Sequence, residues 1–495
     1  MHLDISNNNL NDDCCTEIIQ ALSRPAEDFD SDDKLPTDFG TVSYGHSSVD
    51  AVMKVHNHSI TDLNLGYNEL SENAAEALIN MIKNNAVLHT LHLNCCTSIS
   101  PIYFRKFTNA LRLYNSTLQE ISLADTPLTV KTMEYISRIM QSNDTCISKL
   151  DFSNCGLRHQ HLNACLKNIL LSKHLTHLIL SGNKLSDTGA AILATIIEGQ
   201  KQQYSITTTT AMTNTSGSNS INDQPTTAVC LPPLKVLDVS NCDLKPEGCK
   251  VILVAISTRD VPFQLLNLSN NIFGSDNIDG FEALSRCAIY DLRMNMCNIA
   301  SHGAAILFQY LATTTSNNTN KAINNNTNTT NNTTNNISNN NINNINNRLS
   351  HMLKVLCLSG NEIADSAMIS FGLLLQSNNC SLEFIDMGFN LITDHSMDIL
   401  KKSSAVTSTD SPTRKLYGLT VNFIGNRCDP YIVGPPGYAR SKYTFDLGTR
   451  PNLLDPLNKG YSHVPSISRA NYFVRKELDN IYRASYPQQT INSIE

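Results

Sequence analysis

Residues 175–193 read LTHLILSGNKLSDTGAAIL, and this stretch decides the fold. Leu178 and Leu180 alternate as on a β-strand. Leu175 and Leu185 stand where the chain enters and leaves a tight turn, so all four side chains can point into one interior. A single unit of this size cannot bury its apolar face alone. The stretch therefore predicts that similar units recur along the chain.

The second half of the stretch predicts a polar turn followed by a helix. The Asn183 amide can donate to and accept from turn backbone that would otherwise be buried without partners. The residues that follow, SDTGAAILATII, have helical spacing, and Gly189 and Ala190 are small enough to let that helix lie close behind the strand. The stretch thus matches L-x-x-L-x-L-x-x-N-x-L, the leucine-rich-repeat signature.

Aligning the second leucine of this template predicts twelve strands, most of them about 28 residues apart. That period belongs to long repeats in which each strand is followed by a full helix. We therefore expect an α/β leucine-rich-repeat solenoid, a horseshoe with parallel strands on the concave face and helices on the convex face. The aligned residues are Leu3, Leu63, Leu91, Ile121, Leu150, Leu178, Leu237, Leu266, Leu292, Leu356, Ile385 and Leu419.

Three gaps in this series are roughly doubled, and we assign them to flexible insertions at about 24–57, 200–229 and 313–348. The second is rich in Thr and Ser and the third in Asn and Thr, so neither can supply a leucine ladder. The predicted solenoid spans residues 1–426. It begins inside a repeat at Leu3, so we expect either that an upstream part is missing or that the first insertion covers the open edge.

The residue at the asparagine position alternates between cysteine and asparagine over the middle repeats. This alternation, together with the regular period of the strands, resembles the ribonuclease-inhibitor subfamily of leucine-rich-repeat proteins. The same subfamily supplies the sensing domains of nucleotide-binding innate receptors and the GTPase-activating protein for Ran. The resemblance implies a fold and leaves the activity open. The alternating residues are Cys155, Asn183, Cys242, Asn271, Cys297 and Asn361.

Residues 427–495 form a separate C-terminal extension that is rich in proline and tyrosine. It holds nine Lys or Arg and six Asp or Glu, a net charge of 9 − 6 = +3. Its prolines predict little regular structure, except that 467–484 can form one helix with Phe473, Val474, Leu478 and Ile481 on one face. The extension is either a cap whose aromatic side chains cover the last repeat or a tethered peptide that binds a partner.

Composition narrows the class of protein. The chain has 495 residues, 41% hydrophobic content and a net charge of −7, which argues against a nucleic-acid partner. The sequence has neither a signal peptide nor a run long enough to span a bilayer, so we expect no membrane partner and a cytoplasmic location, with nuclear or cytoskeleton-associated placement as alternatives. Many of the fifteen cysteines fall at repeat positions, which suits a reducing compartment.

No motif for catalysis, a cofactor or a metal appears in the sequence. We therefore predict a non-catalytic protein-interaction scaffold or adaptor that binds a protein partner through its concave face. Side chains on this face flank the strand leucines. The candidate partner-binding residues are His92, Asp151, His177, Asp238, Arg293 and Asp386.

The resemblance leaves three other functions open. The main alternative is a GTPase-activating protein of the Ran type, although the extension here is mildly basic and that family implies a strongly acidic tail. A ribonuclease inhibitor proper is expected to carry an acidic, tryptophan-bearing face, and this chain has no Trp. A fragment of an innate sensor would need a nucleotide-binding domain upstream of Met1.

Overall fold

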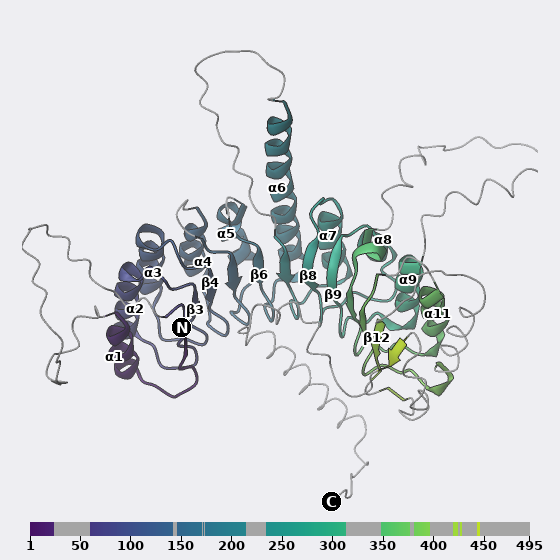
Figure 1. The fold of residues 1–495 in the computed structure, drawn as a ribbon, viewed down its shortest axis with the longest axis horizontal. Coiled ribbons are helices and arrows are strands. Elements are labelled where there is room, and N and C mark those ends of the chain that lie inside the picture. Colours follow the sequence, from purple (N-terminus) through teal and green to yellow (C-terminus); the bar gives the residue numbers. More distant parts are fainter. Residues whose placement is uncertain are drawn as a thin grey trace, which may run out of the picture. The chain divides into compact units, whose positions relative to one another are not determined.

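The computed structural model describes residues 1–23, 60–141, 146–170, 172, 174–213, 234–312, 348–376, 381–396, 419–423, 426–427 and 443–445. These residues form two compact units. The first comprises Met1–Leu178 and Gly199–Leu234, and the second comprises Ile179–Glu198 and Lys235–Glu495. In each unit short parallel strands alternate with helices (Figure 1).

In the first unit, five strands pair in chain order, each parallel to the next. They are β1 (His2–Asp4), β2 (Asp62–Asn64), β3 (Thr90–His92), β4 (Glu120–Ser122) and β5 (Lys149–Asp151). The helices that follow these strands in turn are α1 (Asp12–Ser23), α2 (Glu72–Asn84), α3 (Pro101–Tyr114), α4 (Val130–Ser137) with the 3₁₀ turn η2 (Arg138–Gln141), and α5 (His159–Leu170). The strand β6 (His177–Ile179) lies where the chain passes from one unit to the other.

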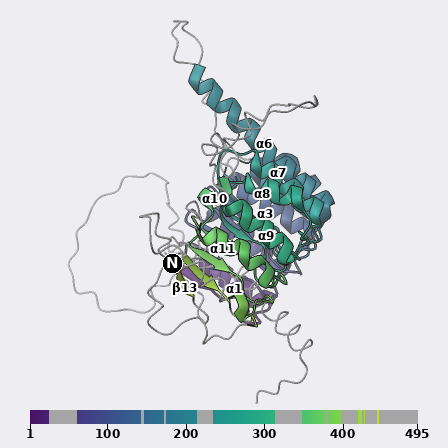
Figure 2. The ribbon, with the colours of Figure 1, turned by 90° about the vertical axis from the view of Figure 1, so that its right-hand side faces the viewer.

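The second unit repeats the same alternation. Its strands are β7 (Val236–Asp238), β8 (Phe263–Asn267), β9 (Ile289–Arg293), β10 (Val355–Cys357), β11 (Phe384–Asp386), β12 (Leu419–Asn422) and β13 (Tyr443–Phe445). Its helices begin with α6 (Ser186–Thr213), whose residues from Gly199 onward belong to the first unit. The others are α7 (Pro246–Ser257), α8 (Ile278–Ser285), α9 (Ala300–Ala312), α10 (Arg348–Met352) and α11 (Met368–Gln376), which the 3₁₀ turn η3 (Asp365–Ala367) precedes. Figure 2 shows α7, α8 and α9 in successive positions.

The strand register places the predicted leucines side by side. In the first unit Leu63 pairs with both Leu3 and Leu91, and in the second Leu292 pairs with both Leu266 and Leu356. Leu3 is half-buried, and the other five side chains are fully inaccessible. The aliphatic ladder that the spacing predicts therefore forms the core behind the strands of each unit.

The asparagine and cysteine positions seal the turns in the predicted way. In α6's repeat, the Asn183 side chain donates to the carbonyls of Leu180 at 2.8 Å and Ser181 at 3.4 Å. At a cysteine position, the Cys242 thiol instead donates to the Leu180 carbonyl at 3.1 Å. Both residue types thus satisfy buried backbone carbonyls where the chain bends.

One strand centre was predicted wrongly. The register pairs Val421, not Leu419, with Ile385 of β11. With this shift of two residues Asn426 occupies the asparagine position, where its amide donates to the Met387 carbonyl at 2.8 Å and accepts the Ile392 N–H at 3.1 Å. The repeat pattern therefore continues to the end of the predicted solenoid at Asn426.

The C-terminal extension contributes a strand that the sequence did not predict. Residues Tyr443–Phe445 form β13, which pairs in parallel with β12 so that Phe445 lies opposite Val421. Proline content argued against regular structure here, but the free edge of β12 offers backbone donors and acceptors that a three-residue strand can satisfy. The remainder of 427–495, apart from Arg427, lies outside the described residues, and so does the predicted helix at 467–484.

One described helix enters the second predicted insertion. Helix α6 continues to Thr213, through the first fourteen residues of the range 200–229. Once the apolar segment 186–197 has nucleated a helix, each further residue adds one backbone hydrogen bond at low cost. Residues 24–59, 214–233 and 313–347 lie outside the described residues, so the other insertions remain predictions.

Candidate functional site

The strands offer one side to the helices and a second side that carries mostly polar residues. Successive strand side chains point to opposite faces, so the residues on either side of each central leucine lie on the face turned away from the leucine core. We call these the first strand face and the second strand face, one in each unit. The first consists of Asp62, Asn64, Thr90, His92, Glu120, Ser122, Lys149 and Asp151, and the second of Ile179, Val236, Asp238, Leu265, Asn267, Asp291, Arg293, Val355, Cys357, Phe384 and Asp386.

A buried ion pair lies on the first strand face. Lys149 Nζ of β5 is 2.7 Å from Glu120 Oε1 of β4, and their side chains are only 4% and 12% exposed. The register places these two residues directly opposite each other. Burial raises the pKa of Glu120, and the neighbouring Lys149 ammonium opposes that rise. The sequence pattern predicts neither residue as part of a site, because only the pairing of strands from two successive repeats brings them together.

His92 of β3 lies on the same face and is 3% exposed. Within the described part of the chain, neither of its ring nitrogens has a hydrogen-bond partner. Burial lowers the pKa of His92 to about 4, helped by the positive charge of Lys149 and opposed by Asp151. The imidazole is therefore neutral at pH 7 and keeps an unused N–H donor and an unused nitrogen acceptor.

The second strand face carries its own buried ion pair. Arg293 Nη2 is 2.8 Å from Asp291 Oδ2, two residues earlier on β9. Asp238 of β7 accepts a hydrogen bond from Asn267 Nδ2 of β8 at 3.0 Å. Burial raises the pKa of Asp238, whereas hydrogen bonds from Ser240 and Asn267 and the charge of Arg293 oppose that rise.

Part of the second strand face is apolar. Ile179, Val236 and Leu265 form one cluster from three strands, and each is 1–2% exposed. Val355 and Phe384 continue the apolar row on β10 and β11, and both are buried. These side chains point away from the helices and are still inaccessible to solvent. The neighbouring strands, about 4.8 Å away in the plane of the sheet, do not cover this face, so other atoms must lie over it.

Three of the predicted partner-binding residues hold turns of their own chain. The carboxylates of Asp151, Asp238 and Asp386 each accept the backbone N–H two residues further on, at 2.9, 2.9 and 3.0 Å. Asp151 and Asp238 also accept the hydroxyl of Ser153 and Ser240. The sequence pattern Asp-x-Ser, which directly follows the strand residues Leu150 and Leu237, signals this role.

The structure divides the six predicted residues between the two units. His92, Asp151 and His177 belong to the first, and Asp238, Arg293 and Asp386 to the second. His177 Nδ1 lies 2.8 Å from the hydroxyl of its neighbour Thr176. Five of the six are buried, and Arg293 is half-buried. Whether they bind a partner stays a prediction.

The described cysteines are free thiols. Burial raises the pKa of Cys165 and Cys297 to about 12, so these thiols are neutral at pH 7. Among the described residues there is no group of three or more His, Cys, Asp or Glu that could hold a metal ion. In the described chain, the adjacent pairs each join one buried thiol, Cys15 or Cys96, to one more accessible thiol, Cys14 or Cys95.

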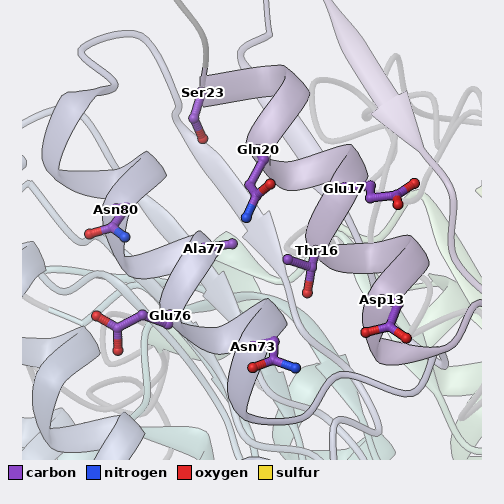
Figure 3. A pocket seen from close by; sticks show the side chains of 9 residues that line it. All are labelled: Asp13, Thr16, Glu17, Gln20, Ser23, Asn73, Glu76, Ala77 and Asn80. Atoms are coloured by element: carbon purple, nitrogen blue, oxygen red, sulfur yellow. The ribbon is translucent and has the colours of Figure 1, made fainter.

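A polar groove of about 860 Å³ lies between α1 and α2 on the helical side of the first unit (Figure 3). Asp13, Thr16 and Glu17 line one wall and Glu76 the other. The Glu76 carboxylate pairs with Lys106 of α3 at 2.9 Å. None of the buried polar atoms that lack a partner in the described chain belongs to this lining. The groove is therefore a solvated gap between neighbouring helices.

In the part of the chain that the structure describes, no helix has the length and apolar character to cross a bilayer.

Comparison with known proteins agrees with this geometry. The family model described as Leucine Rich repeat matches residues 56–78, 171–194, 230–253 and 349–372. These matches, the repeated strand and helix units and the sealed turns define the chain as a leucine-rich-repeat protein with an α/β solenoid fold.

The relatives that match are larger proteins. Human NACHT, LRR and PYD domains-containing protein 5 is 25% identical over 138 residues, which are 28% of this chain and 11% of that protein. The mouse protein of the same name is 25% identical over 48% of this chain and 18% of its own length. This chain therefore spans less than a fifth of either relative.

Solved structures also match at low identity. A chain in the crystal structure of the Rad7 and Elc1 complex of yeast has a TM-score of 0.43 and 12% identity, with 78% of this chain and 75% of that chain covered. The APL1 leucine-rich repeat domain has a TM-score of 0.29 and 13% identity, with 75% of this chain and 79% of that chain covered.

Proposed function

We propose that this protein is a non-catalytic interaction scaffold whose strand faces bind a protein partner. The observation that carries the proposal is His92. A buried side chain whose two ring nitrogens lack partners within the described chain costs stability, and such costs are expected where a site serves binding. Both nitrogens are inaccessible in this structure, so a protein partner can meet them with its backbone and side-chain groups only if binding exposes the imidazole.

The surroundings of His92 favour a polar recognition surface. The buried pair of Glu120 and Lys149 holds two opposite charges on adjacent strands of the same face. A fixed ion pair of this kind adds specificity through charge complementarity. The alternating Asn and Cys turns support membership of the ribonuclease-inhibitor-like subfamily, and the neutral free thiols support a reducing, cytoplasmic setting.

The test is affinity purification of the full chain in three forms: wild type, His92→Phe and His302→Phe. His302 is exposed on α9, so it supplies a matched His-to-Phe control away from both strand faces. We expect a partner that binds the wild type and His302→Phe equally and binds His92→Phe at least about tenfold more weakly. Equal binding to all three forms would place the binding surface elsewhere.

A second arm separates the main alternative. Single-turnover GTP hydrolysis by Ran is measured with and without the purified chain. The scaffold function predicts no change in rate. An acceleration of about a thousandfold or more would instead establish the GTPase-activating function.

A further inference from the structure

The apolar cluster of the second strand face needs a covering element. Ile179, Val236 and Leu265 come from β6, β7 and β8 and lie opposite in direction to the core leucines of the same strands. Their exposure of 1–2% matches that of core residues. The polar residues Asp238 and Asp291 of the same face are equally inaccessible, so low exposure alone does not identify the cover, but apolar side chains are the ones that pack best on an apolar cluster.

The charges around this cluster indicate the chemistry of that segment. The second strand face carries the carboxylates of Asp238, Asp291 and Asp386 and one guanidinium, that of Arg293. Three negative groups against one positive group favour a basic occupant. Burial raises the pKa of Asp238, so an added positive charge nearby would stabilise its ionised form.

One segment of this chain has the matching composition. Residues 467–484 place Phe473, Val474, Leu478 and Ile481 on one face of a predicted helix. The same eighteen residues contain four Arg or Lys and two Asp or Glu, a net charge of 4 − 2 = +2. An apolar stripe flanked by basic side chains complements an apolar cluster flanked by carboxylates.

The chain can also bring this segment to the second strand face. The extension leaves the described residues at Phe445 of β13, which pairs with β12 in the second unit. The linker 446–466 contains 466 − 445 = 21 residues, which can span roughly 70 Å. The six strand intervals from β13 to β7 amount to only about 29 Å.

We propose that residues 467–484 bind the second strand face of their own chain as an amphipathic helix, with Leu478 and its apolar neighbours on Val236 and Leu265 and with basic side chains toward Asp238 and Asp386. The C-terminal extension then acts as an internal ligand that an external partner of this face must displace. The inference goes beyond the proposed scaffold function and does not depend on the identity of any partner.

Hydrogen–deuterium exchange of the full chain tests the proposal. In the wild type we expect the amides of 467–484 to exchange at least about tenfold more slowly than those of the free peptide 467–484. Val236→Asp should remove this protection, because it places a carboxylate in the apolar cluster. Val254→Asp should retain it, because Val254 is 44% exposed on α7.

A second pair of variants avoids any change in the solenoid. Leu478→Asp should abolish the protection of 467–484, whereas Leu454→Asp in the linker should preserve it. The amides of β8 and α8 report that the repeats stay folded in every variant. Exchange of 467–484 at the free-peptide rate in the wild type would overturn the proposal. So would protection that survives Leu478→Asp, or protection that falls on dilution, since the latter would mean binding between two copies.

Discussion

The side-chain carbonyl of Asn361 accepts the backbone N–H of Cys297 at 2.8 Å, although 64 residues separate them in the sequence. The Asn361 amide also donates to the Met294 carbonyl at 2.7 Å. These bonds join the repeats of β9 and β10, and residues 313–347 lie between the two in the chain. The contact between adjacent repeats thus has the same form as at Asn271, where no insertion intervenes.

The first prediction concerns the Asn/Thr-rich insertion. Replacing residues 314–346 by a Gly/Ser linker of about eight residues should change the free energy of unfolding by no more than about 1 kcal/mol. Loop-closure entropy varies slowly with length, and the bonds of Asn361 to Cys297 and Met294 do not involve the insertion. Urea denaturation followed by circular dichroism measures the change. A loss above about 2 kcal/mol would mean that the insertion contributes packing.

The second prediction compares the two kinds of turn residue. Asn271 accepts the N–H groups of Cys242 and Leu244, both at 3.0 Å, and donates to the carbonyls of Val239 at 2.8 Å and Leu268 at 2.9 Å. Asn271→Ala leaves four buried backbone groups without these partners and should cost about 3 kcal/mol or more.

Cys242→Ala is the matched change. Its thiol donates weakly to two carbonyls, those of Leu180 and Ser240. We expect a loss of about 1 kcal/mol. Thermal and urea unfolding of the two variants give the comparison. Equal losses would show that the asparagine acceptor bonds add nothing beyond packing.

The third prediction is a pH dependence that belongs to His92. The pKa of His92 is lowered to about 4 by burial, below the value of 6.5 for an unhindered histidine. Between pH 6.5 and about pH 4 the unfolded chain therefore binds a proton at this histidine more readily than the folded chain does. The free energy of unfolding falls as the pH decreases through this window. Between pH 7 and pH 5 the loss from this one group is about 2 kcal/mol.

Urea unfolding at pH 7 and pH 5 checks this in the wild type and in His92→Phe. The variant should lose about 2 kcal/mol less than the wild type over the same interval. His302→Phe is the control for the substitution itself at an exposed position on α9. Parallel pH profiles for the wild type and His92→Phe would show that His92 is not protected from protonation.

The fourth prediction concerns backbone strain after the strands. The residue four places beyond the central strand residue has a positive φ in each described repeat of the first unit. After β3 this residue is Cys95, with a φ of 58°. The equivalent residue after β5 is Asn154, with φ of 55°. Asparagine adopts this left-handed region more readily than cysteine. Cys95→Asn should therefore raise stability by about 1 kcal/mol, as measured by the urea midpoint.

Asn154→Gly is the control for strain, and it also removes the exposed hydrogen bond that Asn154 Nδ2 donates to Asp125 Oδ1 at 3.0 Å. Asparagine already tolerates φ near 55°, so glycine should change stability by only a few tenths of a kcal/mol, about the uncertainty of the measurement. A decrease in stability for Cys95→Asn would contradict the strain argument.

The sequence determined the repeat, because burial of leucines at a fixed spacing admits one arrangement of strands and helices. The position of the central residue of β12 could not be predicted in this way. Side chains alternate with a period of two, so a shift of two residues keeps every residue on the same face. Hydrophobic pattern cannot separate Leu419 from Val421, and only the hydrogen bonds of Asn426 across the repeat decide it.

The candidate site was likewise predictable in part from the sequence and in part only from the tertiary structure. The sequence placed His92, Asp151 and Asp238 on the strand faces, because position relative to the strand leucine sets the side that a residue takes. Only the tertiary structure decided which of these side chains hydrogen-bonds to the backbone of its own turn and which side chains of adjacent strands lie next to it. Glu120 and Lys149 show the reason: their pairing depends on the register between strands of two successive repeats, and burial arises from everything that packs around a residue.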